Sequence, residues 1–240
     1  MSPLLPAIEA FRAAGSSDGL WQALHAHLGR LGITGILYGT EALPGPGREA
    51  NFILNSIGHE WLGDKFAHEL FYCDEYVRVA RIDPTPVLWD AIDNLHDIDD
   101  AARRSLALDY DYGIITGVTV PMRFCDGLGG SSIGCHAAGL SLAGFAHLWR
   151  QQGTAITTIV NAFDATLRTG FAAQMFGLSV QEKSCLEYLA SGLLIKQVAD
   201  RMRCTERQMR AIATRARGKL KSLTQEQAVA TALVYGLIDP

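Results

Sequence analysis

Residues 178–220 read LSVQEKSCLEYLASGLLIKQVADRMRCTERQMRAIATRARGKL, and the pattern of this stretch predicts the architecture of the C-terminal part of the chain. Ser179, Thr205 and, beyond the stretch, Thr224 are each followed three residues later by Glu or Gln. In such a capping box the hydroxyl accepts a hydrogen bond from a free amide at the helix start, and the Glu or Gln side chain accepts one in return. Gly192 tolerates the left-handed conformation that ends a helix. The spacing therefore predicts four short, closely spaced helices.

The helix expected after Thr205 has two different sides. At 100° per residue, Met209, Ile212 and Ala216 fall on an apolar side, and arginines and small residues fall opposite. A basic helix with small residues at its centre fits the major groove of DNA. The residues expected to face DNA are Arg207, Gln208, Arg210, Ala211, Thr214, Arg215, Arg217 and Lys219. A solvated helix with an ordinary run of charges has a similar composition. The short helix predicted over residues 195–202 and the tight turn after it favour the DNA-binding interpretation.

Charge is divided unevenly along the 240 residues. Residues 1–170 hold 11 Lys and Arg against 19 Asp and Glu, whereas residues 171–240 hold 10 against 6. A basic module on an acidic body indicates a polyanionic partner at one end of the protein. Hydrophobic residues make up 48% of the chain and charged residues 19%. This balance is typical of a folded protein with a real core and excludes a disordered chain.

Several features of the composition indicate a reduced intracellular setting. No apolar run approaches the roughly 18 residues of a membrane span, and the N-terminus lacks the basic region and cleavage site of a secretory signal. The five cysteines form no close pairs, which fits reduced thiols better than disulfides. None of the seven histidines has metal-ligand spacing. We therefore expect a cytoplasmic protein with no membrane partner, no metal and no resident cofactor.

The N-terminal two thirds of the chain mix helical and strand patterns. Helical spacing covers residues 1–30, 59–80, 99–112 and about 140–171, and strands are expected over residues 33–40, 51–56, 118–124 and 131–136. A turn rich in Pro and Gly over residues 41–49 joins the first two strands, and a glycine-rich turn joins the last two, so each pair is expected to form a hairpin. We predict an α+β chain. Its parts are an α/β/α sandwich with an antiparallel sheet over residues 1–165, a linker over 166–177 and a four-helix helix-turn-helix domain over 178–240.

The sequence resembles the LuxR family of quorum-sensing regulators, because two sets of motifs occur in the same order as in that family. The C-terminal resemblance rests on Leu178-Ser179-x-x-Glu182-x-x-x-Leu186, Ala190-x-Gly192, Val198-Ala199-x-x-Met202, Lys219-Leu220, Ala228-Val229-Ala230 and Gly236-Leu237-Ile238. The N-terminal resemblance rests on Asp83-Pro84, Trp89, Gly113, Gly117 and Pro121. The resemblance implies a domain that binds acyl-homoserine lactones, followed by a DNA-binding domain. It also implies a homodimer that binds two-fold symmetric duplex DNA.

The resemblance further implies a pocket in the N-terminal domain. In the family an aspartate accepts a hydrogen bond from the ligand amide, and a Trp and a Tyr, 13 and 17 residues before it, donate to ligand carbonyls. With Asp83 as that aspartate, the two positions hold Leu70 and Phe66. The family's pocket hydroxyl on the last strand is replaced by Ile133. Tyr38, Trp89 and Thr119 complete the expected pocket.

These replacements leave the ligand open among an acyl-homoserine lactone, another small amphiphile and no ligand. A buried amide carbonyl that loses its donor costs about 1–3 kcal/mol. Apolar side chains need no ligand to satisfy them. We therefore expect the domain to be stable without a ligand, and any ligand to be more apolar around its head group than a lactone amide.

Two functions agree with the sequence. The chain regulates transcription as a DNA-binding homodimer, or it inhibits a related regulator by forming a heterodimer without binding DNA. The second function is favoured by Leu193 and Leu194, which follow Gly192 where the family has Lys and a hydroxyl, and by Ile212 in place of a frequent histidine. Dimerisation is expected through an apolar stripe between Phe145 and Leu167. No enzyme activity is expected, because no nucleophile–base pair emerges from the spacing.

Overall fold

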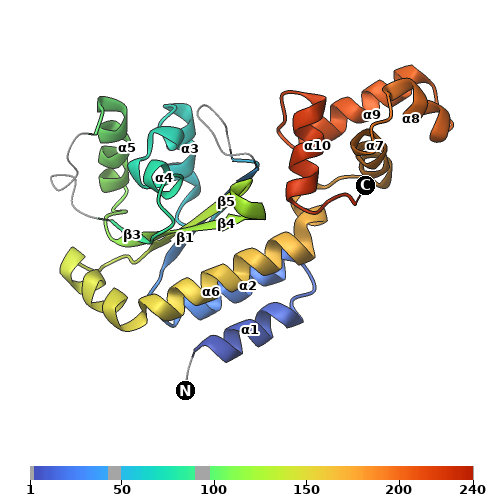
Figure 1. Ribbon diagram of the computed structural model, residues 1–240. Helices are drawn as coiled ribbons and strands as arrows, with labels where there is room; N and C mark the ends of the chain where they lie inside the picture. The colour runs from blue at the N-terminus through green and yellow to red at the C-terminus, as the bar shows by residue number, and fades with distance from the viewer. Residues whose placement is uncertain (1–2, 43–49, 90–97, 240) are drawn as a thin grey trace.

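The computed structural model describes residues 3–42, 50–89 and 98–239. Its N-terminal part is an antiparallel sheet between two layers of helices (Figure 1). The strands are β1 Gly35–Ala42, β2 Phe52–Asn55, β3 Val87–Leu88, β4 Gly117–Phe124 and β5 Gly129–His136, in the spatial order β2-β1-β5-β4-β3. Both predicted hairpins are confirmed, since β1 pairs with β2 and β4 pairs with β5. Of the turn predicted over residues 41–49, the first two residues extend β1 and residues 43–49 lie outside the described residues.

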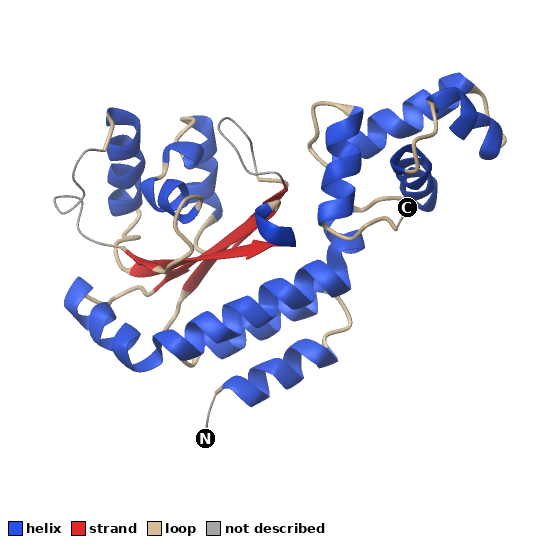
Figure 2. Ribbon diagram, viewed as in Figure 1, coloured by secondary structure: helices blue, strands red, loops and turns tan. Residues whose placement is uncertain are grey.

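The two helical layers cover opposite faces of the sheet (Figures 1 and 2). One layer holds α1 Leu4–Ala13, α2 Ser17–Gly29 and α6 Leu142–Phe176, and the other holds α3 His59–Ala67, α4 Glu75–Ala80 and α5 Asp100–Asp111. Alternate strand residues such as Ile36, Val120 and Ile133 belong to one apolar core with Val160 and Phe163 of α6, and all are at most 1% exposed. Because strand side chains alternate between the two faces of the sheet, the residues next to Ile36, Val120 and Ile133 in their strands face α3, α4 and α5.

The prediction of one helix over residues 59–80 was wrong at its centre. The structure has α3, a 3-10 turn over Phe71–Cys73 and then α4. Glu69 adopts a left-handed conformation (φ 57°) just after α3. The carboxylate of Asp74 then accepts hydrogen bonds from the backbone amides of Tyr76 and Val77 and so begins α4. Asp74 therefore acts as an N-cap, which the apolar periodicity does not reveal.

The helix α6 continues through the predicted linker. It is a single helix of 35 residues that includes residues 166–176, and it ends at Gly177, which adopts a left-handed conformation (φ 57°). Length alone does not make it a membrane segment. Among the residues that the structure describes, no helix combines the length and the apolar character that a membrane crossing requires.

Residues 178–239 form four helices, here called the C-terminal helical unit: α7 Val180–Ala190, α8 Ile195–Arg201, α9 Glu206–Lys219 and α10 Gln225–Val234. The predicted capping boxes at Ser179 and Thr205 are confirmed. At Thr224 only the hydroxyl acts as expected, because the Gln227 side chain accepts from the amide of Leu223 instead. The helices enclose a small core of Cys185, Leu189, Val198, Ala199, Met209 and Ile212.

The C-terminal helical unit packs on the sheet domain near the end of α6 (Figure 1). The ring of Tyr235 contacts the rings of Phe176 and Phe124, with centroid separations of 4.8 and 5.7 Å. The side-chain amide of Asn51 donates a hydrogen bond to the carbonyl of Leu220 at 3.0 Å. Leu220 and Tyr235 belong to the same apolar core as α6. The two parts of the chain therefore share one continuous core.

Candidate functional site

A cavity of about 100 Å³ lies between the sheet and the layer of α3, α4 and α5. Its described lining includes six aromatic side chains, from Trp61, Phe71, Tyr72, Tyr76, Trp89 and Tyr110. The strands contribute small residues, among them Gly39, Ser132 and Gly134. The opposite face of the sheet is filled by the core. This cavity is therefore a place in the sheet domain where a small molecule can be buried.

Trp89 forms an aromatic wall of this cavity. Its indole lies so close to the sheet that a Cβ atom added at Gly117 would be 2.6 Å from the ring, and one added at Gly134 would be 3.2 Å from it. The indole N–H donates to the hydroxyl of Thr119 at 2.9 Å. The ring of Tyr76 stacks on the indole, with a centroid separation of 5.8 Å. Glycines in β4 and β5 therefore make room for the wall, and Thr119 fixes its orientation.

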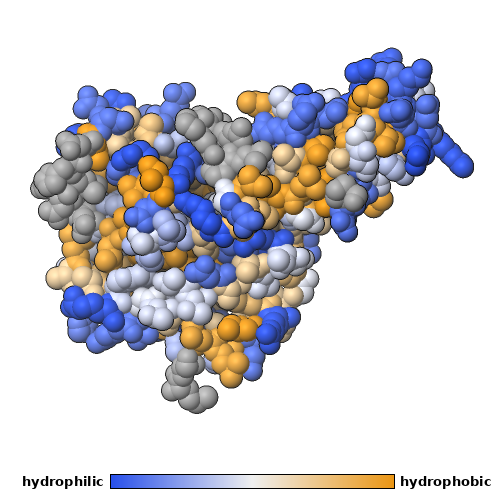
Figure 3. Space-filling view, viewed as in Figure 1, coloured by the Kyte–Doolittle hydropathy of each residue, from blue (hydrophilic) through white to orange (hydrophobic). Residues whose placement is uncertain are grey.

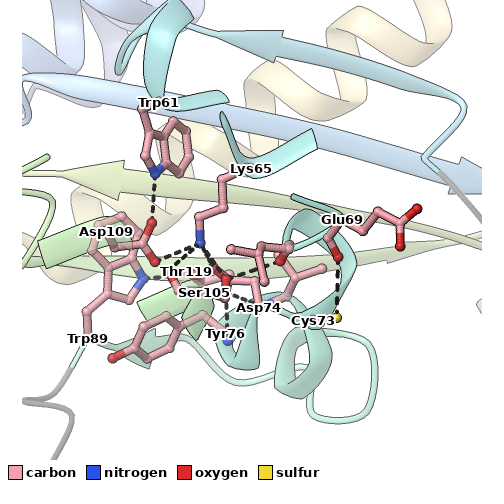
Figure 4. Close-up of polar contacts among 12 residues, drawn as sticks. Trp61, Lys65, Glu69, Cys73, Asp74, Tyr76, Trp89, Ser105, Asp109 and Thr119 are labelled. Carbon is pink, nitrogen blue, oxygen red and sulfur yellow. Dashed lines mark hydrogen bonds and ion pairs between the residues drawn. The ribbon is translucent and has the colours of Figure 1, made fainter. Parts of the chain in front are cut away.

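Lys65 of α3 carries a buried ammonium into the wall of the cavity (Figure 4). The ammonium donates to Asp109 at 2.9 Å, to Asp74 at 3.0 Å and to the hydroxyl of Ser105 at 2.5 Å. The indole N–H of Trp61 donates to the other oxygen of Asp109 at 2.7 Å. The Lys65 side chain is 1% exposed. A buried charge requires such oxygen partners, because it has lost its water. These five residues are here called the polar corner.

Among the charged groups of the described lining, Arg123 donates to the backbone carbonyls of Met122 and Ala80, and the others pair with an opposite charge. Burial and the negative charge of Asp74 raise the pKa of Asp109, and they outweigh the opposing effects of Lys65 and Trp61. Asp109 therefore holds a proton more readily than an isolated aspartate. Elsewhere in the lining, Arg81 pairs with Glu41 at 2.8 Å. Within the described part of the chain, no group of three or more His, Cys, Asp or Glu side chains is placed to hold a metal ion.

A second candidate surface lies on α9. The predicted two-sided helix is confirmed, since Met209, Ile212 and Ala216 are buried, and all eight side chains expected to face DNA are exposed. Figure 3 shows hydrophilic residues gathered over the α8 and α9 end of the C-terminal helical unit. Arg210 pairs with a glutamate on its own helix, and an exposed pair of this kind is weak and can exchange partners. Lys219 pairs at 2.7 Å with Glu182, whose side chain is only 3% exposed.

Residues 16–166 match the family model described as autoinducer binding domain. The chain belongs to this family. Among solved structures, it is similar to CepR2 from Burkholderia cenocepacia, an N-acylhomoserine lactone dependent LuxR family transcription factor. That match has a TM-score of 0.58 and 16% identity over 69% of this chain and 93% of the CepR2 chain in that structure. No curated protein matches the chain in sequence.

Two structures of SdiA are similar over nearly the whole chain. Escherichia coli SdiA matches with a TM-score of 0.58 and 13% identity over 97% of this chain and 96% of its own. SdiA in complex with octanoyl-rac-glycerol matches with a TM-score of 0.57 and 12% identity over 97% of this chain and 94% of its own. The sheet domain is thus an autoinducer-binding domain, and the likeness in fold extends to the C-terminal helical unit.

Two predicted pocket residues of the autoinducer-binding domain, Trp89 and Thr119, line the cavity. Tyr38 and Ile133 lie on the opposite face of the sheet, and both are fully buried there. The hydroxyl of Tyr38 donates to Asp164 of α6 at 2.9 Å. A shift of one residue along a strand moves every side chain to the other face. The strand neighbours of these two residues therefore line the cavity in their place.

Phe66, Leu70 and Asp83 also lie outside the cavity lining. Phe66 is 43% exposed and stacks on Phe71 at 4.7 Å. Leu70 is buried, and its carbonyl accepts the hydroxyl of Ser105. Asp83 is exposed and accepts hydrogen bonds from the amide and hydroxyl of Thr85. Asp83 thus starts a local turn before Pro84, which is a common role of aspartate in this position.

Two aspartates do lie in the cavity wall, Asp74 and Asp109. Trp61 stands 13 residues before Asp74 and Ile57 stands 17 before it, and both line the cavity. This is the spacing that the resemblance implies, so the sequence held a signal for these residues. Counting back from Asp83 instead of from Asp74 placed the predicted pocket residues nine positions too late in the sequence. Lys65 had no such signal, because no motif connects it to its partners on α5.

Proposed function

We propose that the chain is a LuxR-type transcription regulator that binds duplex DNA as a homodimer through α8 and α9. The observation that carries the proposal is the attachment of an autoinducer-binding domain to a helix with an exposed basic side. The small exposed residues Ala211 and Thr214 allow α9 to approach base edges. The short α8 and the turn through Arg203, which has φ 52°, fit a helix-turn-helix arrangement.

The homodimer is part of the proposal because twin helices bind half-sites about one helical turn apart. The apolar stripe of α6 is used mainly by its own domain, since Phe145, Phe163 and Leu167 are at most 2% exposed. Leu148 and Trp149 are only partly buried and extend this stripe. We propose that they contribute to the contact between protomers. Light scattering that shows only monomers at micromolar concentration, with and without DNA, would exclude the homodimer.

The proposal assigns a small-molecule site to the cavity, with Trp89 and Thr119 in its wall. The sequence leaves two ligand classes open, acyl-homoserine lactones and other small amphiphiles. The names of two similar structures mention one example of each class. CepR2 is described as dependent on N-acylhomoserine lactone, and one SdiA structure holds octanoyl-rac-glycerol. Ligands of both classes should therefore be tested for binding to this chain.

The alternative function, an inhibitory partner that forms heterodimers, has one observation in its favour. Leu194 at the start of α8 is 71% exposed where the family has a polar residue. An apolar side chain there offers no hydrogen bond to a phosphate.

A DNA-binding titration against fragments upstream of neighbouring genes tests both functions. Arg207 and Arg217 are exposed and have no ion pair among the described residues, so Arg207→Ala and Arg217→Ala are the informative variants. Each should reduce the slope of log K against log salt by about 0.9 if it contacts a phosphate. Arg104→Ala, on the exposed side of α5, is the matched control. Absence of binding to every fragment at low salt would replace the proposal with the inhibitory function.

A further inference from the structure

The polar corner contains one cationic side chain and two carboxyl groups. Lys65 lies 3.0 Å from Asp74 and 2.9 Å from Asp109. The three side chains are 1%, 13% and 9% exposed, respectively. With both carboxyl groups ionised, the corner would carry an unbalanced negative charge that has lost most of its water. Such a charge is costly to bury, and a buried group usually binds a proton instead.

The hydrogen bonds of Lys65 leave room for this proton (Figure 4). Four oxygen atoms lie within 3.0 Å of the ammonium, on Asp74, on Asp109, and on the hydroxyl and the carbonyl of Ser105. An ammonium has three N–H donors. One acceptor is therefore surplus. An oxygen of Asp109 can bind a proton while Lys65 keeps three acceptors on Asp74 and Ser105.

The surroundings of the two carboxyl groups decide which one binds the proton. The other oxygen of Asp74 accepts hydrogen bonds from two backbone amides at the start of α4, and these favour its ionised form. Asp109 lies in the last turn of α5, where the helix dipole disfavours a negative charge. Its hydrogen bond from Trp61 persists in a neutral carboxyl group, because the carbonyl oxygen still accepts. Asp109 is therefore the group that binds the proton.

The charged residues that the sheet contributes to the described lining have partners of their own. Glu41 of β1 pairs with Arg81, and Arg123 of β4 donates to two backbone carbonyls. Burial, followed by the negative charge of Asp74, raises the pKa of Asp109 from the ordinary 3.8 to about 7, against the opposing effects of Lys65 and Trp61. The proton is therefore exchanged close to neutral pH.

We infer that Asp109 is a proton-binding site in the wall of the cavity, and that proton uptake stabilises the helical layer of α3, α4 and α5. The corner joins these helices, because Lys65 belongs to α3, Asp74 caps α4 and Asp109 belongs to α5. When Asp109 is ionised, the net negative charge weakens this junction. The autoinducer-binding domain thus responds to pH. This inference goes beyond the proposed function, since it requires neither a ligand nor DNA.

The raised pKa of Asp109 determines the direction of the response. A carboxyl group of this kind stabilises the fold below its unfolded-state pKa, and the contribution is lost as the pH rises through the folded-state pKa. The loss should therefore extend from about pH 4 to just above pH 7. Burial lowers the pKa of His25, His27 and His136, which gives the opposite trend on the acid side. Comparison of the wild type with Asp109→Asn removes this contribution.

The first test follows the indole N–H of Trp61 by NMR in the full-length, nitrogen-15-labelled protein. The chain has four tryptophans, and Trp61→Phe assigns the signal. Because this N–H is donated to Asp109, its chemical shift should titrate with a midpoint near pH 7. The midpoint should disappear in Asp109→Asn. It should remain in the matched control His59→Gln, which removes an exposed histidine two residues before Trp61. A wild-type signal that does not titrate near neutral pH, or a midpoint that persists in Asp109→Asn, would overturn the inference.

The second test measures the Tm of the same full-length proteins at about pH 6 and about pH 8. Over this range the wild type should lose about 3 °C relative to Asp109→Asn, and His59→Gln should follow the wild type. Equal pH dependence in the wild type and Asp109→Asn would overturn the stabilising role of the proton. If Asp109→Asn does not fold, an NMR midpoint near pH 7 in both the wild type and His59→Gln supports the inference, and its absence overturns it. Loss of DNA binding alters neither measurement, so the inference and the proposed function fail separately.

Discussion

The hydroxyl oxygens of Thr40 and Tyr235 lie 3.0 Å apart in a hydrogen bond between the autoinducer-binding domain and the C-terminal helical unit. Thr40 belongs to β1 and is one of the cavity-lining residues. Tyr235 follows α10 and also lies 3.3 Å from the side-chain oxygen of Asn51. A residue of the cavity wall is therefore bonded directly to the part of the chain proposed to bind DNA. A shift of β1 in response to a ligand would therefore lengthen or break the hydrogen bond between Thr40 and Tyr235.

The hydroxyl of Tyr235 is expected to hold the two parts together. Tyr235→Phe keeps the ring and removes the hydroxyl, so that the buried side chains of Thr40 and Asn51 each lose one hydrogen bond, which should cost about 1–2 kcal/mol of unfolding free energy. Chemical denaturation measures this loss. Tyr188→Phe is the matched control, because the Tyr188 hydroxyl has no hydrogen bond among the described residues. An equal effect in both variants would show that the contact contributes nothing specific.

Lys65 is expected to be a major stabilising residue of the autoinducer-binding domain. Lys65→Met leaves the buried carboxylates of Asp74 and Asp109 without their cation, which should cost about 3–5 kcal/mol. The exposed Lys183, which lies 4.0 Å from Glu187, provides the control. Lys183→Met should change stability by less than about 1 kcal/mol. Similar denaturation midpoints for both variants would contradict the assigned role.

The elements that sequence could predict are those with local signals. The two hairpins follow from alternating strands and turn residues, and the helices of the C-terminal unit follow from Ser179, Thr205 and Thr224 as N-caps. The strand β3 has only two residues and forms because it pairs with β4. Its residues carry no periodicity of their own. Pairing with a distant strand, rather than local propensity, decides such a segment.

The cavity was harder to predict than the fold. Trp89 was found, but the residues of the polar corner come from α3, α4 and α5, so the ion pair of Lys65 with Asp109 spans 44 positions. No local pattern marks such a pair. Tyr38 and Ile133 were also assigned to the wrong face of the sheet, because both faces of β1 and β5 are largely buried. Apolar periodicity cannot separate two buried faces.

Glu182 is expected to make stability depend on pH in the acid range. Burial acts to raise its pKa, but hydrogen bonds from Lys219 and Ser179 outweigh burial and lower the pKa below the ordinary 4.5. A carboxyl with a lowered folded-state pKa stabilises the fold above its unfolded pKa, and this contribution is lost as the pH falls through the folded-state value. Glu182→Gln should therefore lose less stability than the wild type on acidification. Tm measured from neutral pH to below 4.5 checks this.

The control for Glu182 is Glu226→Gln, which changes an exposed glutamate on α10. On acidification, the Tm of this variant should fall in the same way as that of the wild type. Parallel acid limbs for wild type and Glu182→Gln would show that the hydrogen bonds of Glu182 do not stabilise its ionised form.

The cysteines should report on the docking of the C-terminal helical unit. Burial raises the pKa of Cys135 to about 12, and burial, with a smaller contribution from Cys204, raises that of Cys185 to about 11. The thiolate is the reactive form, so both should resist a thiol reagent until the protein unfolds. Cys125 is exposed, and its thiol donates to the carbonyl of Val234 at 3.3 Å.

We therefore expect Cys125 to be labelled in the native protein, and Cys125→Ser to remove that fast phase. Because Val234 precedes Tyr235, Tyr235→Phe should speed the labelling of Cys125 by weakening the hydrogen bond that its thiol donates to Val234. The rates of Cys135 and Cys185 should stay slow in the same variant, since both lie inside separate cores. Equal acceleration of all three would instead indicate global unfolding. An unchanged Cys125 rate would show that the hydroxyl of Tyr235 does not control docking.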